Sequence, residues 1–226
     1  MIDAQRKARL LREFKLNGFI LLRSFLPAEL VSGMHEQLQP ILRAEHRKAQ
    51  EDGFKRGRAQ GRLALDLSEY IRLLGGPLAD ARFLGNRFIE ELVDALMGGS
   101  DRWKRGWTQV EVAFRGPDYV AWHSDQSPED TPDPHALHET IRLTYNIPLV
   151  DFTAENGALE VLPGSHRLPR ADSLSVDLTD VENLFPVPLH LRRGDALLRD
   201  GNTLHRGTPN RTDEPRPMLD QTYKRR

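Results

Sequence analysis

The sequence predicts a mainly β fold of the α+β type, in which helices come first and a sandwich or jelly roll follows. Before about residue 105, apolar residues recur at helical spacing. From Trp107 onward, short β-like runs alternate with turns rich in glycine and proline. The 226 residues contain no internal repeat and no low-complexity linker. We therefore expect a single domain over residues 1–226, helix-rich over 1–105 and β over 106–226.

Three helices and one strand are expected in the first half. Each helix is recognised by an apolar stripe, and the first and third end at glycines, Gly18 and Gly98–Gly99. Pro27 is favourable at the start of the second helix. The predicted ranges are 2–16, 27 to about 51 and 79–97 for the helices, and 19–22 for the strand.

The β half is expected to consist of short strands separated by turns. Residues 108–114 alternate with the two-residue period of a strand, and Gly116–Pro117–Asp118 follows as a turn. The later predicted strands cover residues 141–148, 158–162, 188–191, 196–199 and 218–223.

Composition excludes several classes of partner and site. Lysine and arginine (32) nearly balance aspartate and glutamate (33), so the net charge of −1 gives no field to attract nucleic acid or an anionic membrane. The absence of cysteine excludes disulfides, thiolate zinc sites and a cysteine nucleophile. The first sixteen residues are too charged for a secretory signal, and no apolar run is long enough to span a bilayer. We expect a cytoplasmic protein that acts on a small molecule; its oligomeric state is open.

One constellation of residues indicates a metal centre. His123 and Asp125 are two positions apart, and alternate residues of a strand point to the same side. His205, 80 positions after Asp125, completes the set if its strand lies alongside. Two histidines and one carboxylate on one face of a metal are typical of non-haem Fe(II) oxygenases. Three positions then stay open, two for a chelating keto acid and one for O2.

Arg216 strengthens this hypothesis. It follows His205 by eleven positions, at the start of a predicted strand, so a hairpin would return it towards the metal. Its guanidinium can grip a distal carboxylate in bidentate fashion, which lysine does less well. A protein that only binds metal does not need this arginine.

Several stretches together resemble the phytanoyl-CoA dioxygenase family of Fe(II)/2-oxoglutarate oxygenases. They occur in the family's order and cover most of the chain, more thinly between residues 25 and 105. No single stretch is specific, but the set is. The matching stretches are Asn17–Ile20, Trp122–Asp125, Glu155–His166, Arg193–Ala196 and His205–Arg216.

The resemblance implies a double-stranded β-helix (jelly-roll, cupin-like) core with the N-terminal helices packed outside. It implies that His123, Asp125 and His205 bind Fe(II) and that Arg216 pairs with the far carboxylate of 2-oxoglutarate. The expected reaction is hydroxylation of a small organic molecule, coupled to decarboxylation of 2-oxoglutarate to succinate and CO2 with O2 as second cosubstrate. Related halogenases lack the metal carboxylate, so Asp125 favours hydroxylation, or a related desaturation or epoxidation.

The chain also departs from the family pattern. Family members usually carry a small or hydroxyl residue, often serine, two positions after the second metal histidine, and Gly207 stands there. That contact with the cosubstrate is therefore either missing or supplied by Thr208. Gln109 and Thr144 are further candidate contacts to 2-oxoglutarate.

Other residues admit two interpretations. Arg142 binds a substrate carboxylate or, as we favour, forms a structural ion pair. Trp122 lies at the pocket mouth or, as we favour, in the core. The basic stretch 52–62 is an anion clamp or, more simply, a solvated loop. Residues 127–139, with His135 and His138, are expected to form a lid. The alternative function is a cupin-like metal-binding protein or sensor without oxygenase activity.

Overall fold

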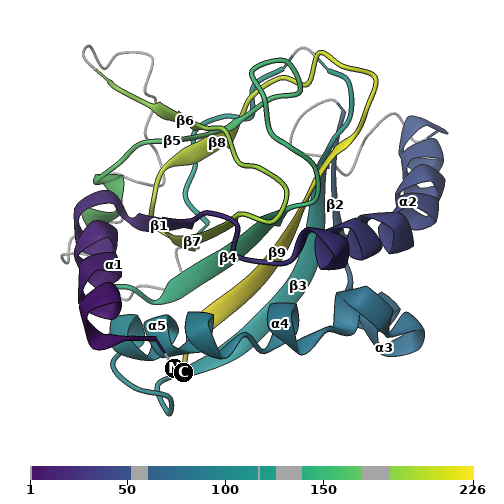
Figure 1. Ribbon diagram of the computed structural model, residues 1–226. Helices are drawn as coiled ribbons and strands as arrows, with labels where there is room; N and C mark the ends of the chain where they lie inside the picture. Colours follow the sequence, from purple (N-terminus) through teal and green to yellow (C-terminus); the bar gives the residue numbers. More distant parts are fainter. Residues whose placement is uncertain (1, 52–60, 117, 126–138, 169–183) are drawn as a thin grey trace.

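The computed structural model describes residues 2–51, 61–116, 118–125, 139–168 and 184–226. Its strands form two antiparallel sheets (Figure 1). The large sheet has the order β1-β7-β4-β9-β3-β2, and the small sheet has the order β6-β5-β8. The strands are β1 Phe19–Leu22, β2 Arg62–Asp66, β3 Trp103–Ala113, β4 Arg142–Pro148, β5 Leu159–Val161, β6 Val187–Leu189, β7 Ala196–Asp200, β8 His205–Gly207 and β9 Arg216–Arg225.

Helices cover one side of the large sheet, and the small sheet lies on the other side (Figure 1). We call the side towards the helices the outer face and the side towards the small sheet the inner face. The helices are α1 Ala4–Asn17, α2 Ala28–Glu51, α3 Ser68–Leu74, α4 Ala81–Leu84 and α5 Arg87–Met97, with short 3-10 turns η1 Gly76–Ala79 and η3 Ser165–Arg167.

The outer face forms the main hydrophobic core. Alternate residues of the central strands, such as Leu143, Tyr145 and Leu219, are buried against apolar residues of the helices. The intervening residues of the same strands point to the inner face, as the two-residue period of a strand requires. A second apolar cluster lies between the sheets and joins Leu159 and Val161 of the small sheet to Leu197 and Met218 of the large sheet.

The predicted order of helices followed by a jelly roll is confirmed, with one error in the helices. The single helix expected over 79–97 is interrupted, because α4 ends at Gly85 and Asn86 begins a new helix. The Asn86 side-chain oxygen accepts hydrogen bonds from the Phe88 and Ile89 amides, which makes it the N-cap of α5. Strand β2 and helix α3 were not predicted.

Two sequence predictions fall largely outside the described residues. These are the basic loop, of which only Gly61 and Arg62 are described, and the lid, of which only Glu139 is described. His135 and His138 therefore stay untested. Among the described residues, no helix has the length and apolar character to cross a bilayer.

Candidate metal centre and active site

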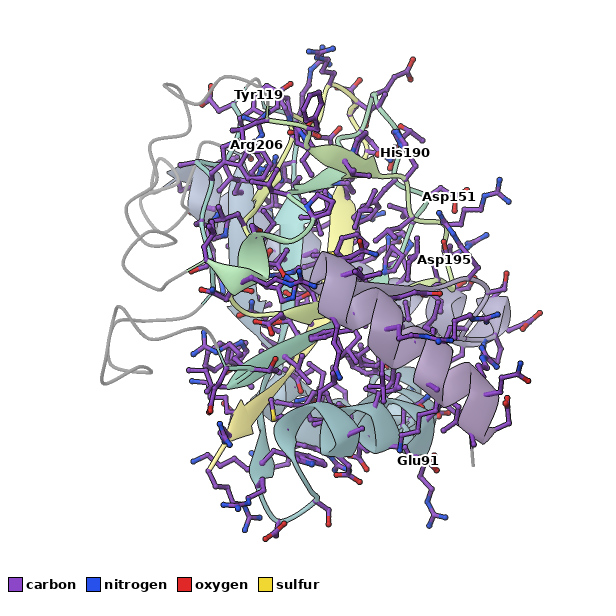
Figure 2. The ribbon with its side chains drawn as sticks, turned by 90° about the vertical axis from the view of Figure 1, so that its left-hand side faces the viewer. Glu91, Tyr119, Asp151, His190, Asp195 and Arg206 are labelled. Carbon is purple, nitrogen blue, oxygen red and sulfur yellow. The ribbon has the colours of Figure 1, made fainter. Side chains whose placement is uncertain are left out.

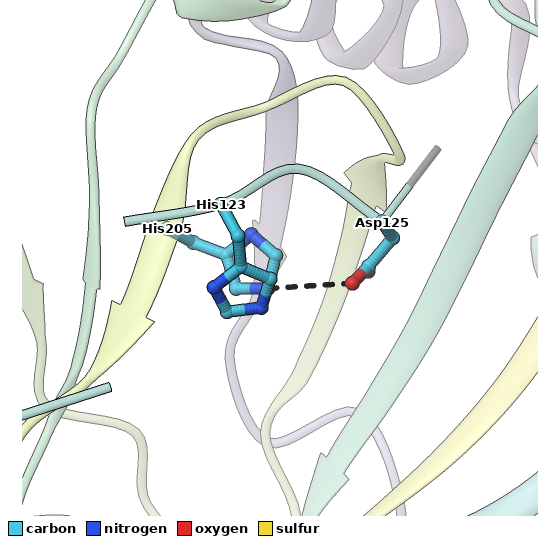
Figure 3. Close-up of side chains that lie close together, drawn as sticks. All are labelled: His123, Asp125 and His205. Carbon is cyan, nitrogen blue, oxygen red and sulfur yellow. Dashed lines mark ion pairs between the residues drawn. The ribbon is translucent and has the colours of Figure 1, made fainter. Parts of the chain in front are cut away.

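The structure brings His123, Asp125 and His205 together. One ligand atom from each side chain lies within 4.8 Å of the others, and the His205 Nε2 atom is 3.6 Å from Asp125 Oδ1 (Figure 3). The two imidazole centroids are 4.2 Å apart. The structure therefore places His205 next to His123 and Asp125, although it follows Asp125 by 80 positions in the sequence.

Backbone hydrogen bonds hold the three side chains in place. His123 and His205 form an isolated antiparallel bridge, in which each backbone amide donates to the carbonyl of the other residue. The Asp125 amide donates to the Gly201 carbonyl at 2.7 Å, beside the turn between β7 and β8. The segment carrying the motif is thus attached to β8 and that turn, although it forms no long strand of its own.

The Nδ1 atom of each imidazole lies close to a backbone carbonyl. The Nδ1 atom of His123 lies 2.8 Å from the Ala121 carbonyl, and that of His205 lies 3.0 Å from the Thr203 carbonyl. The Ala121 carbonyl only accepts, so Nδ1 of His123 carries the proton and its Nε2 keeps its lone pair. Nδ1 of His205 also lies 3.1 Å from Arg199 Nη1, which only donates, so a donor and an acceptor both adjoin this nitrogen. Metal binding through Nε2 of His205 would select the tautomer that is protonated at Nδ1. Burial, with a contribution from Arg199, holds the pKa of His205 well below its usual value. His205 is therefore neutral, as a metal ligand must be.

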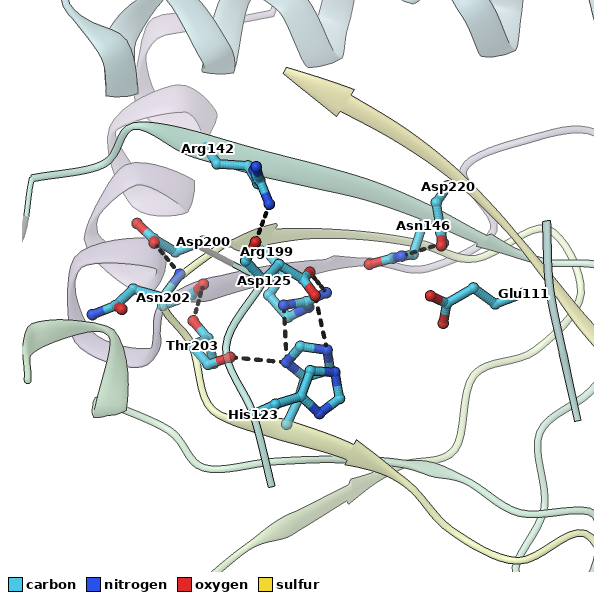
Figure 4. Close-up of polar contacts among 12 residues, drawn as sticks. Glu111, His123, Asp125, Arg142, Asn146, Arg199, Asp200, Asn202, Thr203 and Asp220 are labelled. Carbon is cyan, nitrogen blue, oxygen red and sulfur yellow. Dashed lines mark hydrogen bonds and ion pairs between the residues drawn. The ribbon is translucent and has the colours of Figure 1, made fainter. Parts of the chain in front are cut away.

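Arg199 is a functional residue that sequence reasoning missed. It is buried on the inner face of β7, and its Nη2 donates to Asp125 Oδ2 at 2.6 Å (Figure 4). Burial alone would raise the pKa of Asp125, but Arg199, His205 and His123 together lower it below the usual carboxyl value. Asp125 therefore stays ionised, with Oδ2 held by Arg199 and Oδ1 turned towards His205.

These three side chains fit a divalent first-row metal. Two neutral imidazoles and one ionised carboxylate match the donor set of non-haem Fe(II) sites that keep open positions. The contact between Arg199 and Asp125 resembles the outer hydrogen bonds that fix the orientation of metal ligands in general.

A cavity of about 200 Å³, the first cavity, extends from His123 and His205 to Arg216. Arg216 is only 5% exposed, its guanidinium packs 4.4 Å from the Phe152 ring centroid, and its Nε atom has no hydrogen-bond partner. Burial, with a contribution from Arg62, lowers the pKa of Arg216 to about 9. Among the described residues, no carboxylate forms an ion pair with Arg216. Glu111, which lines the same cavity, attracts this guanidinium, but a buried cation without a direct ion pair is stabilised further when an anion binds it.

Arg62 fills the space that a serine would occupy in the family pattern. A Cβ atom at Gly207 would lie 2.7 Å from Arg62 Nη1. The Arg62 guanidinium also donates to the Thr208 carbonyl. The Thr208 hydroxyl donates to the Ala158 carbonyl at 2.9 Å, so the suggestion that Thr208 replaces the missing contact is wrong. Sequence reasoning missed Arg62, because it ends a stretch that resembles a solvated loop.

A second cavity, of about 160 Å³, also borders Asp125 and His205. Gln109 lines both cavities, whereas Thr144 and Arg142 line only the second. Thr144 therefore lies away from Arg216. The Arg142 guanidinium donates to the Asp125 carbonyl and packs 4.9 Å from the Trp107 ring centroid.

Trp122 lies neither in the hydrophobic core nor among the residues that line the two cavities. Its ring packs against the guanidinium of Arg206, 4.7 Å from the ring centroid, and the ring of Tyr119 packs against the same guanidinium at 4.3 Å. Figure 2 places Arg206 and Tyr119 together at one end of the molecule. The favoured expectation of a core tryptophan is therefore wrong.

Comparison with known proteins identifies the family. The model of the family described as Phytanoyl-CoA dioxygenase (PhyH) matches residues 14–218. Dioxygenase aneA of Aspergillus aculeatus is 27% identical over 91% of this chain and 68% of its own length. The iron/alpha-ketoglutarate-dependent dioxygenase penM of Penicillium thymicola is 26% identical over 91% of this chain and 64% of its own length.

A solved structure shows the same fold. The non-haem alpha-ketoglutarate-dependent epimerase SnoN from nogalamycin biosynthesis has a TM-score of 0.69 at 22% identity, over 98% of this chain and 82% of SnoN. Alpha-ketoglutarate is another name for 2-oxoglutarate. The alternative of a metal-binding protein without oxygenase activity has no support in these comparisons. The chain belongs to the phytanoyl-CoA dioxygenase family of iron- and 2-oxoglutarate-dependent oxygenases.

Proposed function

We propose that this enzyme hydroxylates a small organic molecule at an Fe(II) ion held by His123, Asp125 and His205. One observation carries the proposal: three suitable ligands adjoin a cavity that is also lined by Arg216, a buried arginine that forms no ion pair among the described residues. Bound iron supplies the O2 activation that couples decarboxylation of 2-oxoglutarate, giving succinate and CO2, to insertion of one oxygen atom into a substrate C–H bond.

Arg216 binds the distal carboxylate of 2-oxoglutarate in the first cavity. A dicarboxylate is a suitable occupant, because its near end chelates the metal and its far end can pair with the Arg216 guanidinium, whose Nε atom has no hydrogen-bond partner. Arg62 adds a second guanidinium beside Arg216, in place of the hydroxyl group that Gly207 cannot offer. Gln109 lines the same cavity and contributes an amide.

The second cavity receives the primary substrate. It shares Asp125 and His205 with the metal centre, so a molecule within it lies next to the ion, and Arg216 does not line it. With 2-oxoglutarate in the first cavity, this space remains for the group that is oxidised. A cytoplasmic location, a single domain and the absence of nucleic-acid or membrane partners stay predictions from the sequence.

Anaerobic titration of the Fe(II)-loaded protein with 2-oxoglutarate tests the proposal. A keto acid chelated to Fe(II) gives a weak visible charge-transfer band, which we expect in the wild type and not in His205→Ala. Arg216→Ala should need about 10 to 100 times more 2-oxoglutarate, because it loses charge-assisted hydrogen bonds of about 1.5–3 kcal/mol.

Arg211→Ala is the matched control, since Arg211 is exposed in the loop between the same two strands. This variant should titrate like the wild type. No band in iron-loaded wild-type protein would overturn the metal and cosubstrate sites together. A normal titration of Arg216→Ala would overturn the role of Arg216 alone.

A further inference from the structure

A cluster of four side chains adjoins the metal centre without entering either cavity. At its centre is Arg206, whose guanidinium packs 4.3 Å from the ring centroid of Tyr119 and 4.7 Å from that of Trp122. The Arg206 Nε atom also donates to Glu160 Oε2 at 2.6 Å. None of these four residues except Glu160 and Tyr119 lines a cavity at all, and none lines the two cavities at the metal centre. Any effect of Arg206 on the reaction must therefore pass through its neighbours.

The strand register places this cluster directly behind the histidines of the metal centre. His123 and His205 form an antiparallel bridge, so the next residues along the two chains, Trp122 and Arg206, lie opposite one another. On its other side β8 pairs with β5, and there Glu160 lies opposite Arg206. Neighbouring residues of an extended chain point to opposite faces. The row formed by Trp122, Arg206 and Glu160 therefore lies on the reverse side of the two histidines.

The segment that carries His123 and Asp125 has few attachments of its own. Residues 118–125 contain no named strand, and among the described residues their backbone is tied to other segments by main-chain hydrogen bonds only at Val120, His123 and Asp125. A metal ligand on such a segment has to be ordered when the metal binds, and this lowers the affinity. Contacts between side chains that hold the segment beforehand avoid that loss.

The chemistry of Arg206 suits such an attachment. A guanidinium is planar, so it can pack against aromatic rings while its N–H groups donate hydrogen bonds at the edge. Arg206 thereby joins three segments: β8 through its own backbone, the segment 118–125 through Trp122, and β5 through Glu160. The side chains of Arg206 and Glu160 are 26% and 17% exposed, so water screens their ion pair only in part.

We propose that Arg206 is a positioning residue of the metal centre. Through its contact with Trp122, the guanidinium keeps the neighbouring His123 in place before a metal binds. Metal affinity then depends on a side chain that touches neither the metal nor a molecule in the two cavities. The inference rests on the proposed function, because it assumes that the ion is held by His123, Asp125 and His205.

A double-mutant cycle on metal affinity tests this role. Arg206→Met removes the guanidinium and keeps an unbranched side chain, and Trp122→Leu removes the ring. Each should weaken Mn(II) binding by about tenfold, the lower end of the loss that follows removal of outer contacts to metal ligands. Because both changes break one contact, the double variant should also lose about tenfold, whereas independent effects would multiply to about a hundredfold. Unchanged affinity in both single variants, or losses that multiply, would overturn the proposal.

Two further variants separate positioning from a merely structural role. Trp122→Phe keeps an aromatic ring for the guanidinium and should recover most of the Mn(II) affinity that Trp122→Leu loses; no recovery would contradict the proposal. Arg105→Ala is the matched control, because Arg105 forms a comparable ion pair with Glu90 at 2.5 Å and lies outside both cavities. It should leave Mn(II) affinity unchanged, whatever its effect on the melting temperature. Arg206 and Trp122 lie outside the hydrophobic clusters, so we expect their variants to fold.

The order of the measurements distinguishes this inference from the proposed function. Competition with a chelator first gives the Mn(II) dissociation constants of the wild type and of His205→Ala. Failure of the wild type to bind Mn(II), or unchanged binding in His205→Ala, would overturn the proposed metal centre. Binding that depends on His205 but not on Arg206 or Trp122 would overturn the positioning role alone and leave the metal centre intact.

Discussion

The two faces of the large sheet are made by the same strands and bury opposite kinds of side chain. On β4, Leu143, Tyr145 and Ile147 face the helices, while the alternate residues Thr144 and Asn146 face the cavities. β9 repeats the pattern with Leu219 outside and Asp220 inside. The outer face gains free energy by removing apolar surface from water, whereas the inner face costs free energy by burying charges and unpaired polar atoms.

The outer face of the sheet therefore contributes most of the stability, and the inner face carries the residues of the active site. Buried carboxylates, arginines and unpartnered oxygens persist on the inner face because the outer face and the helices fix the strands independently of them. Variants on the two faces test this separation. A variant on the outer face should change the unfolding free energy, whereas a variant in the metal centre on the inner face should change metal binding or activity.

The largest effect is expected from His205→Ala on the inner face. Loss of one of three ligands should abolish iron-dependent succinate formation, while the far-UV circular dichroism and the cooperative unfolding transition remain. His190→Ala is the control, because His190 is exposed and lies outside both cavities. Full activity of His205→Ala would mean that the metal is held elsewhere.

The next effect is expected from Leu219→Ala on the outer face. Leu219 is fully buried in the main core, and truncation of such a leucine costs about 2–5 kcal/mol of unfolding free energy. Urea unfolding should show this loss, while the protein that remains folded should bind 2-oxoglutarate with nearly wild-type affinity. A loss of 2-oxoglutarate binding in the folded state would show that the two faces are not separable.

A smaller effect is expected from Arg199→Met. Arg199 holds Asp125 Oδ2 at 2.6 Å and so leaves Oδ1 for the metal. Removing an outer contact of this kind commonly lowers metal affinity by about 10 to 100 times. Competition with a chelator should show this loss for Mn(II), with partial recovery in Arg199→Lys. Tighter metal binding in Arg199→Met would mean that the guanidinium acts mainly as a repelling charge.

The sequence predicts the part of the site that depends on local spacing. The two-residue separation of His123 and Asp125 places both side chains on the same side of the chain, and Arg216 follows His205 by eleven positions. The strands were recognisable by their alternation and the helices by their apolar stripes. These features require no knowledge of what lies across the sheet.

The missed residues depend on contacts between distant segments. Arg199 follows the apolar run Ala196–Leu198, and only the pairing of β7 with β4 reveals that its side chain enters the site. Arg62 is 145 positions before Gly207, so nothing local connects the two residues. Asn146 lies on the same face of β4 as Arg142 and Thr144, because the three residues are two positions apart. This two-residue alternation could have predicted that Asn146 points to the inner face.

The smallest effect concerns the pH dependence of stability on the inner face. Burial, reinforced by Glu111 and Asp125, raises the pKa of Asp220 well above its usual value. In the unfolded chain, the Asp220 side chain has a pKa of about 3.9. Above that pH the folded protein still holds the proton, so folding takes up a proton and stability falls as the pH rises towards the folded-state pKa.

Asp220→Asn removes this proton uptake and keeps an oxygen that can accept from Asn146. Its unfolding free energy relative to the wild type should therefore increase with pH from about pH 4, by at most about 1.4 kcal/mol per pH unit. Urea unfolding of metal-free protein at several pH values between 5 and 8 measures the difference. If the two proteins instead show the same dependence of unfolding free energy on pH, Asp220 is already ionised in the folded protein. The hydrogen bonds from Asn146 and Gln109, which lower its pKa, would then outweigh burial and the neighbouring carboxylates, which raise it.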